Sequence, residues 1–137
     1  MIKLHRFFLF QSKDEYYFRR GNRYNRHDKY AKAIRAFRRA TDLNPSFVEA
    51  YNNMGNAYNG LGDHAAALMN FRQALRINPH YATAYYNIGL TCIMLGDYLS
   101  AIEAFEEALG IDPYDKSSRQ KLDALRKRLK EQDDSRL

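Results

Sequence analysis

The sequence predicts an all-α protein built from a repeated pair of helices. Two observations carry this prediction: a period of 34 residues, and apolar residues that recur three and four positions apart inside each period. The only prolines of the chain, Pro45, Pro79 and Pro113, follow that period. Five further columns keep it: Tyr17, Tyr51 and Tyr85; Gly21, Gly55 and Gly89; Ala33, Ala67 and Ala101; Phe37, Phe71 and Phe105; Ala40, Ala74 and Ala108.

The middle period shows the helical pattern in both of its halves. Tyr51, Met54 and Tyr58 have the spacing of one helix face, and a second apolar face follows after a Gly-Asp turn. Asp63 is expected to cap the second helix, and Pro79 to end it, because the residue before proline avoids the helical region. The expected helices are residues 14–26, 29–43, 48–60, 64–77, 82–95, 98–111 and 115–132.

The last of these helices is expected to close the array. Leu122, Leu125 and Leu129 form a narrow apolar stripe among basic residues, and Asp123 stands in the glycine column, so no fourth repeat follows. A half-apolar terminal helix is what a repeat array needs as a cap. A separate binding role for this helix is the alternative.

Composition limits the class of protein. The chain has 137 residues, 22 Lys and Arg against 16 Asp and Glu, and one Cys. One Cys forms no internal disulfide, and no apolar run approaches the roughly 20 residues that cross a bilayer. We therefore expect a soluble, cytoplasmic, single-domain protein with no transmembrane segment.

The columns of the middle period, Tyr51, Met54-Gly55, Tyr58, Ala67, Phe71, Ala74 and Pro79, resemble the tetratricopeptide repeat family. The resemblance covers about residues 14–115 and implies three repeats, at 14–47, 48–81 and 82–115, stacked as a right-handed solenoid. Residues 116–137 would then be a capping helix and a frayed tail. The chain departs from the family pattern where Tyr replaces Trp, at Arg20 and at Cys92.

The residues that enzymes use do not form a recognisable motif. The sequence lacks a phosphate-binding glycine loop, a His-Glu-x-x-His or Cys-x-x-Cys motif and a nucleophile elbow. Its four histidines do not pair on one helix, and Cys92 falls in a core column. We predict no catalytic residue, no cofactor and no metal site, and hence no enzyme.

The family's architecture implies a function in binding proteins, because the first helix of each repeat lines a concave groove. A run of asparagines faces that groove, although Asn is a poor helix former. Amides can both donate to and accept from a peptide backbone, although Asn is also common at these columns in the family. The expected peptide-binding residues are Arg19, Asn22, Asn52, Asn53, Asn56, Tyr86, Asn87 and Leu90.

One subclass of the family holds the C-terminal carboxylate of heat-shock chaperones with two Asn, Lys and Arg. Asn22 and Asn53 stand at the matching Asn positions, but Phe18, Thr83 and Asn87 stand where the cations would be. Without those cations the carboxylate loses its charge-assisted hydrogen bonds. This narrower function is therefore not expected, although Arg19 and Arg26 offer a partial substitute.

Charge is unevenly distributed along the chain. Residues 1–47 carry a net +8 and residues 82–115 a net −6, and Lys32, Arg35 and Arg39 share a helix face. An acidic protein partner and a merely solvated face both remain open, whereas nucleic acid is disfavoured by the acidic third repeat. The alternative function is a scaffold that self-assembles head to tail or through its N-terminal segment, giving a homo-oligomer.

Residues 1–13 precede the first repeat and contain four consecutive large apolar residues, 7–10. Such a cluster is seldom left in water. We expect it to cap the first repeat or to bind another copy, and the remaining alternative is a disordered or membrane-touching tail.

Overall fold

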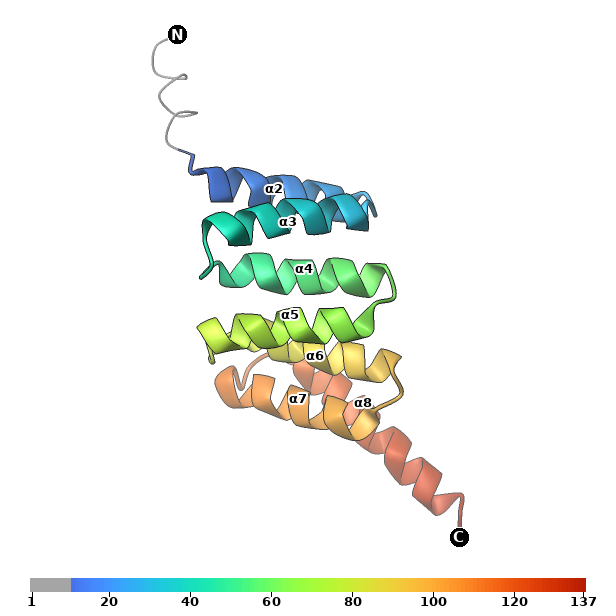
Figure 1. The fold of residues 1–137 in the computed structure, drawn as a ribbon. Helices are drawn as coiled ribbons and strands as arrows, with labels where there is room; N and C mark the ends of the chain where they lie inside the picture. Colours follow the sequence, from blue (N-terminus) through green and yellow to red (C-terminus); the bar gives the residue numbers. More distant parts are fainter. Residues whose placement is uncertain (1–10) are drawn as a thin grey trace. The chain divides into compact units, whose positions relative to one another are not determined.

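The structure is a computed structural model that describes residues 11–137. Within this range it is entirely helical (Figure 1), which confirms the predicted fold class. The helices are α2 (Lys13–Arg26), α3 (Tyr30–Leu43), α4 (Val48–Gly60), α5 (His64–Ile77), α6 (Ala82–Met94), α7 (Tyr98–Ile111) and α8 (Lys116–Asp134). Their ends agree with the expected ends to within two residues. The expectation for the apolar N-terminal cluster lies outside the described residues.

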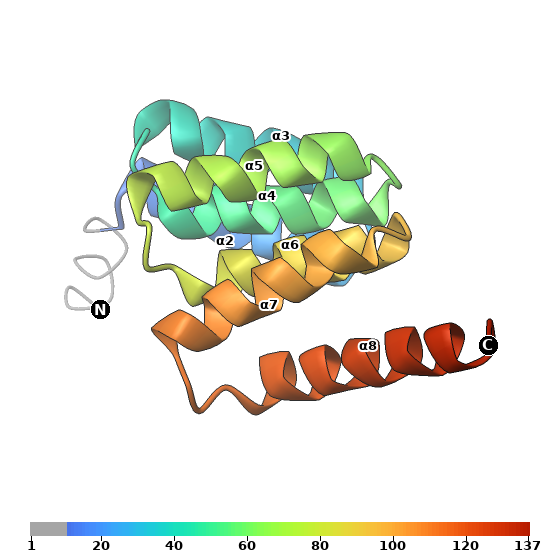
Figure 2. The same cartoon turned by 90° about the horizontal axis from the view of Figure 1, so that it is seen from below.

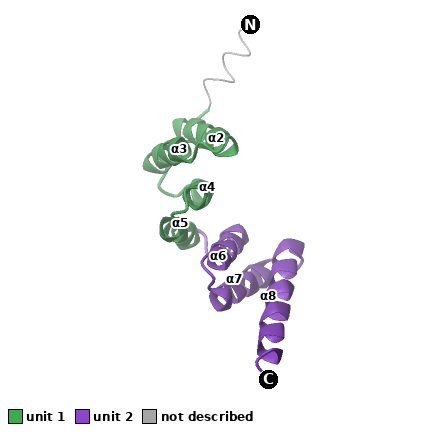
Figure 3. Ribbon diagram, turned by 90° about the vertical axis from the view of Figure 1, so that its right-hand side faces the viewer, with its two compact units in different colours: residues 1–77 green, residues 78–137 purple. Residues whose placement is uncertain are grey.

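The chain divides into two compact units, residues 1–77 and 78–137 (Figure 3). Unit 1 contains the antiparallel pairs α2–α3 and α4–α5, and unit 2 contains the pair α6–α7 followed by α8. No helix among residues 11–137 combines the length and the hydropathy needed to cross a membrane.

Each helix pair closes around one phenylalanine. Phe37, Phe71 and Phe105 are completely buried in the second helix of their pairs. Each ring lies against a glycine of the first helix: a Cβ built on Gly55 would come within 2.5 Å of the Phe71 ring, and the first and third repeats have the same close approach. The glycine column therefore exists because the backbone of the first helix touches an aromatic ring.

The turn inside each pair uses a left-handed residue. Gly62 and Gly96 take φ values of 79° and 76°, whereas the first pair places Asp28 there, at φ 56°. The next residue caps the second helix. The Asp63 carboxylate accepts from Ala66 N–H, as predicted, and the third pair repeats this cap with Asp97, but the first pair has Lys29, whose side chain makes no capping bond.

The two pairs of unit 1 meet through α3 and α4. Ile34 and Phe37 of α3 form one buried cluster with Met54 and Ala57 of α4. At its edge, a Cβ on Gly60 would lie 2.5 Å from the Tyr30 ring, so this glycine also marks a close approach. An additional hydrogen bond joins the pairs where the Arg38 guanidinium donates to the Tyr58 hydroxyl, 2.9 Å away.

Helix α8 lies beside α7 in unit 2 (Figure 2), as expected of a cap. Leu122 and Leu125 are buried, and Arg126 forms an ion pair with Glu106 of α7. Asp115 caps the N-terminus of the helix, since its carboxylate accepts from the backbone N–H groups of Ser117 and Ser118. The apolar stripe predicted from sequence is therefore the packed face of this helix.

Replacing glycine by alanine should change the free energy of unfolding in opposite directions at two positions. Gly55→Ala should lower the free energy of unfolding by about 1–3 kcal/mol, because its Cβ overpacks the Phe71 ring. Gly110→Ala, in α7 with nothing within 4 Å of the added Cβ, should raise it by up to about 1 kcal/mol through helix propensity. Urea unfolding followed by circular dichroism measures both. Equal effects of the two substitutions would contradict the assigned role of the glycine column.

The missing cap of the first pair offers a stabilising change. Lys29 has φ −88° and ψ 62°, close to the φ −88° and ψ 77° of Asp97, which caps α7. Lys29→Asp should therefore add about 1 kcal/mol to the free energy of unfolding. Thermal unfolding checks the gain, and Lys29→Ala, which removes the charge without adding an acceptor, should not reproduce it.

The cap of α8 should make stability depend on pH. The Ser118 hydroxyl donates to the Asp115 carboxylate, and this bond, with the backbone N–H groups of Ser118 and Ser117, lowers the pKa of Asp115 below its ordinary 3.8. A lowered pKa gives stability that is present above the unfolded pKa and is lost as pH falls through the folded pKa. The melting temperature of the wild type should exceed that of Asp115→Asn at neutral pH, and the difference should shrink as pH falls below 3.8 and vanish once Asp115 is protonated in the folded protein. A difference that persists in acid would show that the charge is not responsible.

Candidate functional site

The first helices of the two pairs in unit 1 form an open pocket of about 500 Å³. Four of its lining side chains come from α2, namely Arg19, Asn22, Asn25 and Arg26, and Asn53 comes from α4. We call it the amide–arginine pocket. Its lining contains amides and guanidinium groups but no carboxylate, so it suits a ligand that carries hydrogen-bonding groups and negative charge.

The amides of this pocket are joined into a chain. Asn53 Nδ2 donates to Asn22 Oδ1 at 2.8 Å, which ties α4 to α2. Asn52 Nδ2 in turn donates to Asn53 Oδ1 at 3.3 Å. These bonds fix the orientation of the two pocket amides. Among the described residues, the Nδ2 group of Asn22 has no hydrogen-bond acceptor, so it can donate to a ligand.

One acceptor in the pocket lining is left without a donor. Asn25 Oδ1 is shielded from solvent and has no hydrogen-bond partner among the described residues. Leaving a buried acceptor unpaired costs about 1–3 kcal/mol. A side-chain amide turns easily about its last torsion, so Asn25 can present this oxygen to a donor that enters the pocket.

The two arginines differ in how their charge is balanced. Arg19 Nε lies 2.9 Å from Glu15 Oε1, one turn earlier on α2; Arg19 is largely exposed and Glu15 is half-buried. Arg26, in the last turn of α2, forms no ion pair within residues 11–137. Its positive charge is therefore the one that the pocket offers to a ligand.

Phe18 explains why the matching cation of the chaperone-binding subclass is missing. Its ring packs against Phe37, with ring centroids 6.0 Å apart, and against Phe47 at 4.6 Å. This position is used for packing in unit 1 rather than for charge.

The structure brings only some of the expected peptide-binding residues together. Arg19, Asn22 and Asn53 line the pocket, and Asn56 is half-buried on α4. Asn52 is only 2% exposed, so it supports Asn53 from below and offers no surface of its own.

The remaining expected residues belong to unit 2. Asn87 is 9% exposed, so it too is buried. Leu90 is half-buried, and the Tyr86 ring packs against Phe105 with centroids 5.7 Å apart. Asn25 and Arg26 also line the pocket, although neither is among the expected peptide-binding residues. The burial of Asn25 Oδ1 left no signal in the sequence.

The next feature is the placement of the side chains that could bind a metal ion. Residues 11–137 contain no group of three or more His, Cys, Asp or Glu side chains close enough to hold a metal ion, and Cys92 is buried with a free thiol. The groups that the amide–arginine pocket contains are recognition groups, namely amide donors and acceptors and guanidinium charge.

Comparisons with known proteins agree with the repeat period and the helix pairs. A family model described as tetratricopeptide repeat matches residues 47–113, and a second, described as TPR repeat, matches residues 21–62. The chain belongs to the tetratricopeptide repeat family, whose members are interaction modules. A sequence comparison with curated proteins finds no match.

Solved structures of the same fold include complexes with peptides. The first TPR of Spaghetti (RPAP3), bound to the HSP90 peptide SRMEEVD, is 25% identical with a TM-score of 0.80, over 85% of this chain and 93% of that chain. The Arabidopsis OM64 TPR domain is 25% identical with a TM-score of 0.80, over 85% and 96%. The Sgt2 TPR domain from Aspergillus fumigatus is 22% identical with a TM-score of 0.82, over 90% and 83%.

Proposed function

We propose that the chain is a protein–protein interaction module and that its amide–arginine pocket binds an extended segment of a partner protein. The observation that carries the proposal is the Asn53–Asn22 hydrogen bond, which sets two amides from different helix pairs at one open pocket. A TPR domain of similar structure is bound to a peptide, which supports the same use here.

The chemistry of the pocket indicates how such a segment would be held. The Asn22 amide donates to a peptide carbonyl, and the Asn25 amide, once turned, accepts from a peptide N–H. Arg26 attracts an acidic side chain or a terminal carboxylate, because a charge-assisted hydrogen bond is roughly twice as strong as a neutral one. The amides read the backbone, so sequence preference comes mainly from the arginine.

This pocket also differs from that of the chaperone-binding subclass in the cations that would hold a terminal carboxylate. Phe18 packs against the core cluster of unit 1 and Asn87 is buried, so neither position supplies a cation of that clamp. We therefore expect the peptide SRMEEVD to bind this chain more weakly than peptides selected for it.

Asn22→Ala combined with Asn53→Ala tests the proposal. Peptides would first be selected from a random display library on the full chain, and the best one titrated by calorimetry. The double variant should bind it about tenfold more weakly, because about 1.4 kcal/mol is the share of one or two lost hydrogen bonds. The melting temperature should fall only slightly, because both side chains are only half-buried.

Asn70→Ala is the matched control. Its amide donates to the Ala66 carbonyl of its own helix α5, at 2.9 Å, outside the pocket. This variant should keep the wild-type affinity. If the double variant binds the selected peptide as tightly as the wild type does, the pocket is not the binding site.

A further inference from the structure

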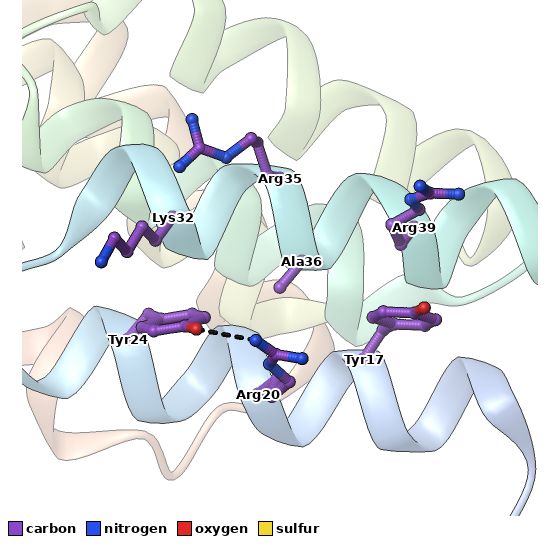
Figure 4. A pocket seen from close by; sticks show the side chains of 7 residues that line it. All are labelled: Tyr17, Arg20, Tyr24, Lys32, Arg35, Ala36 and Arg39. Carbon is purple, nitrogen blue, oxygen red and sulfur yellow. Dashed lines mark hydrogen bonds between the residues drawn. The ribbon is translucent and has the colours of Figure 1, made fainter.

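A second open surface lies at the other side of the first helix pair (Figure 4). It is a cleft of about 270 Å³ between α2 and α3. Its lining, which we call the basic end face, consists of Tyr17, Arg20, Tyr24, Lys32, Arg35, Ala36 and Arg39.

The basic end face has no negative charge to balance its cations. Four of the lining residues are cationic and none is acidic. Within residues 11–137, none of these four cations forms an ion pair. Three of the four carboxylates in residues 11–47 are engaged elsewhere, since Asp28 accepts from the Tyr30 hydroxyl, Asp14 from the Asn44 amide and Glu15 pairs with Arg19. The fourth, Asp42, lies beyond Arg39 on α3 and forms no ion pair within residues 11–137. Such a surface attracts an anionic partner.

Arg20 is held in place at the centre of this face. Its guanidinium donates to the Tyr24 hydroxyl at 2.9 Å and to the Tyr16 hydroxyl at 3.2 Å. These bonds raise the pKa of Arg20 and lower the pKa of Tyr24. A guanidinium has five N–H donors, so Arg20 keeps donors for a ligand while losing little freedom on binding.

In the second helix pair, the face that matches the α2 part of the basic end face is covered by another helix of the same protein. On α4 the matching residues are Tyr51, Met54 and Tyr58, and they are covered by helix α3. Met54 is only 4% exposed there. A face of this shape therefore accepts an α-helix packed along it.

The first pair differs from the second in charge at the matching positions. Arg20 stands where the second pair has Met54, and the α3 cations stand where α5 has uncharged residues. The three α3 positions and their counterparts are Lys32, Arg35 and Arg39 against Ala66, Met69 and Gln73. We propose that the basic end face docks an acidic amphipathic helix of a partner protein.

A nucleic acid fits this face less well, although phosphates would suit its charge. Single-stranded nucleic acids bind through bases stacked on exposed aromatic faces. Here Tyr17 packs edge-on against Tyr16, and Tyr24 is partly buried against the core cluster, with Arg20 Cζ 5.7 Å and Lys32 Nζ 5.9 Å from its ring centroid. The rings are already used by the protein.

A second copy of the chain fits less well through its terminal helix. Residues 116–137 carry 8 basic and 4 acidic side chains, a net +4, which would be repelled by the basic end face. The acidic helix of a second copy, α7, already has its apolar face buried against its neighbours α6 and α8. An acidic amphipathic helix of another protein is therefore the occupant that satisfies both the packing and the charge.

The test uses the full chain and a designed fluorescent peptide of about 16 residues, with Leu at helical a and d positions and Glu at the flanking positions. Fluorescence anisotropy would be measured at about 50 mM and about 300 mM NaCl. Arg35→Glu combined with Arg39→Glu should weaken binding at least about tenfold. A peptide with Lys in place of every Glu should reverse the preference, binding this variant better than the wild type.

The matched control is Arg72→Glu combined with Arg76→Glu. These two arginines are also exposed and four residues apart, but they lie on α5, outside the basic end face. The control should keep the wild-type affinity within about twofold, whereas a mere effect of net charge would weaken both variants equally and overturn the proposal.

Three other outcomes would also overturn the proposal. One is that a peptide with the same charges and a central proline binds the wild type as tightly as the designed peptide does, because the occupant would then not be a helix. Another is a single-stranded oligonucleotide that binds more tightly than the peptide and loses affinity in Arg35→Glu/Arg39→Glu. The third is wild-type sedimentation as an oligomer at low salt that the same variant converts to a monomer, because a second copy would then occupy the face.

Discussion

The packing of a phenylalanine ring on a glycine is the contact on which each helix pair depends. Phe71 of the second pair is completely buried, and its ring touches the backbone of α4 at Gly55. Because this contact sets the distance between the two helices, it also decides which residues of the first helix remain at the surface. The basic end face, which lies between the paired helices α2 and α3, is a consequence of that spacing.

The helices could be predicted from the sequence because the period repeats the same physical requirements three times. Proline stops, small residues at close contacts and apolar spacing each appear in every period, so their agreement fixed the helix ends. The left-handed turn of the first pair was harder to predict, because Asp28 replaces the glycine found there in the other two pairs.

The site could be predicted only in part. The asparagine run indicated the side of α4 that lines the pocket, but adjacent positions on a helix point in different directions, and a sequence does not say which lies beneath the next helix. Asn53 reaches the pocket, whereas Asn52 beside it is buried as its support. The grouping of Arg20 with the α3 cations required the structure, because those residues come from two helices.

Tyr30 links the turn of the first pair to the end of the second. Its hydroxyl donates to Asp28, the left-handed residue, at 2.8 Å, and its ring lies against Gly60 at the end of α4. Loosening of either pair therefore disturbs a contact that the other pair needs. In a repeat protein, where stability is the sum of repeat and interface contributions, this contact adds to the interface contribution. Slowly exchanging amide protons of α2–α3 and of α4–α5 would then open in one cooperative event rather than two.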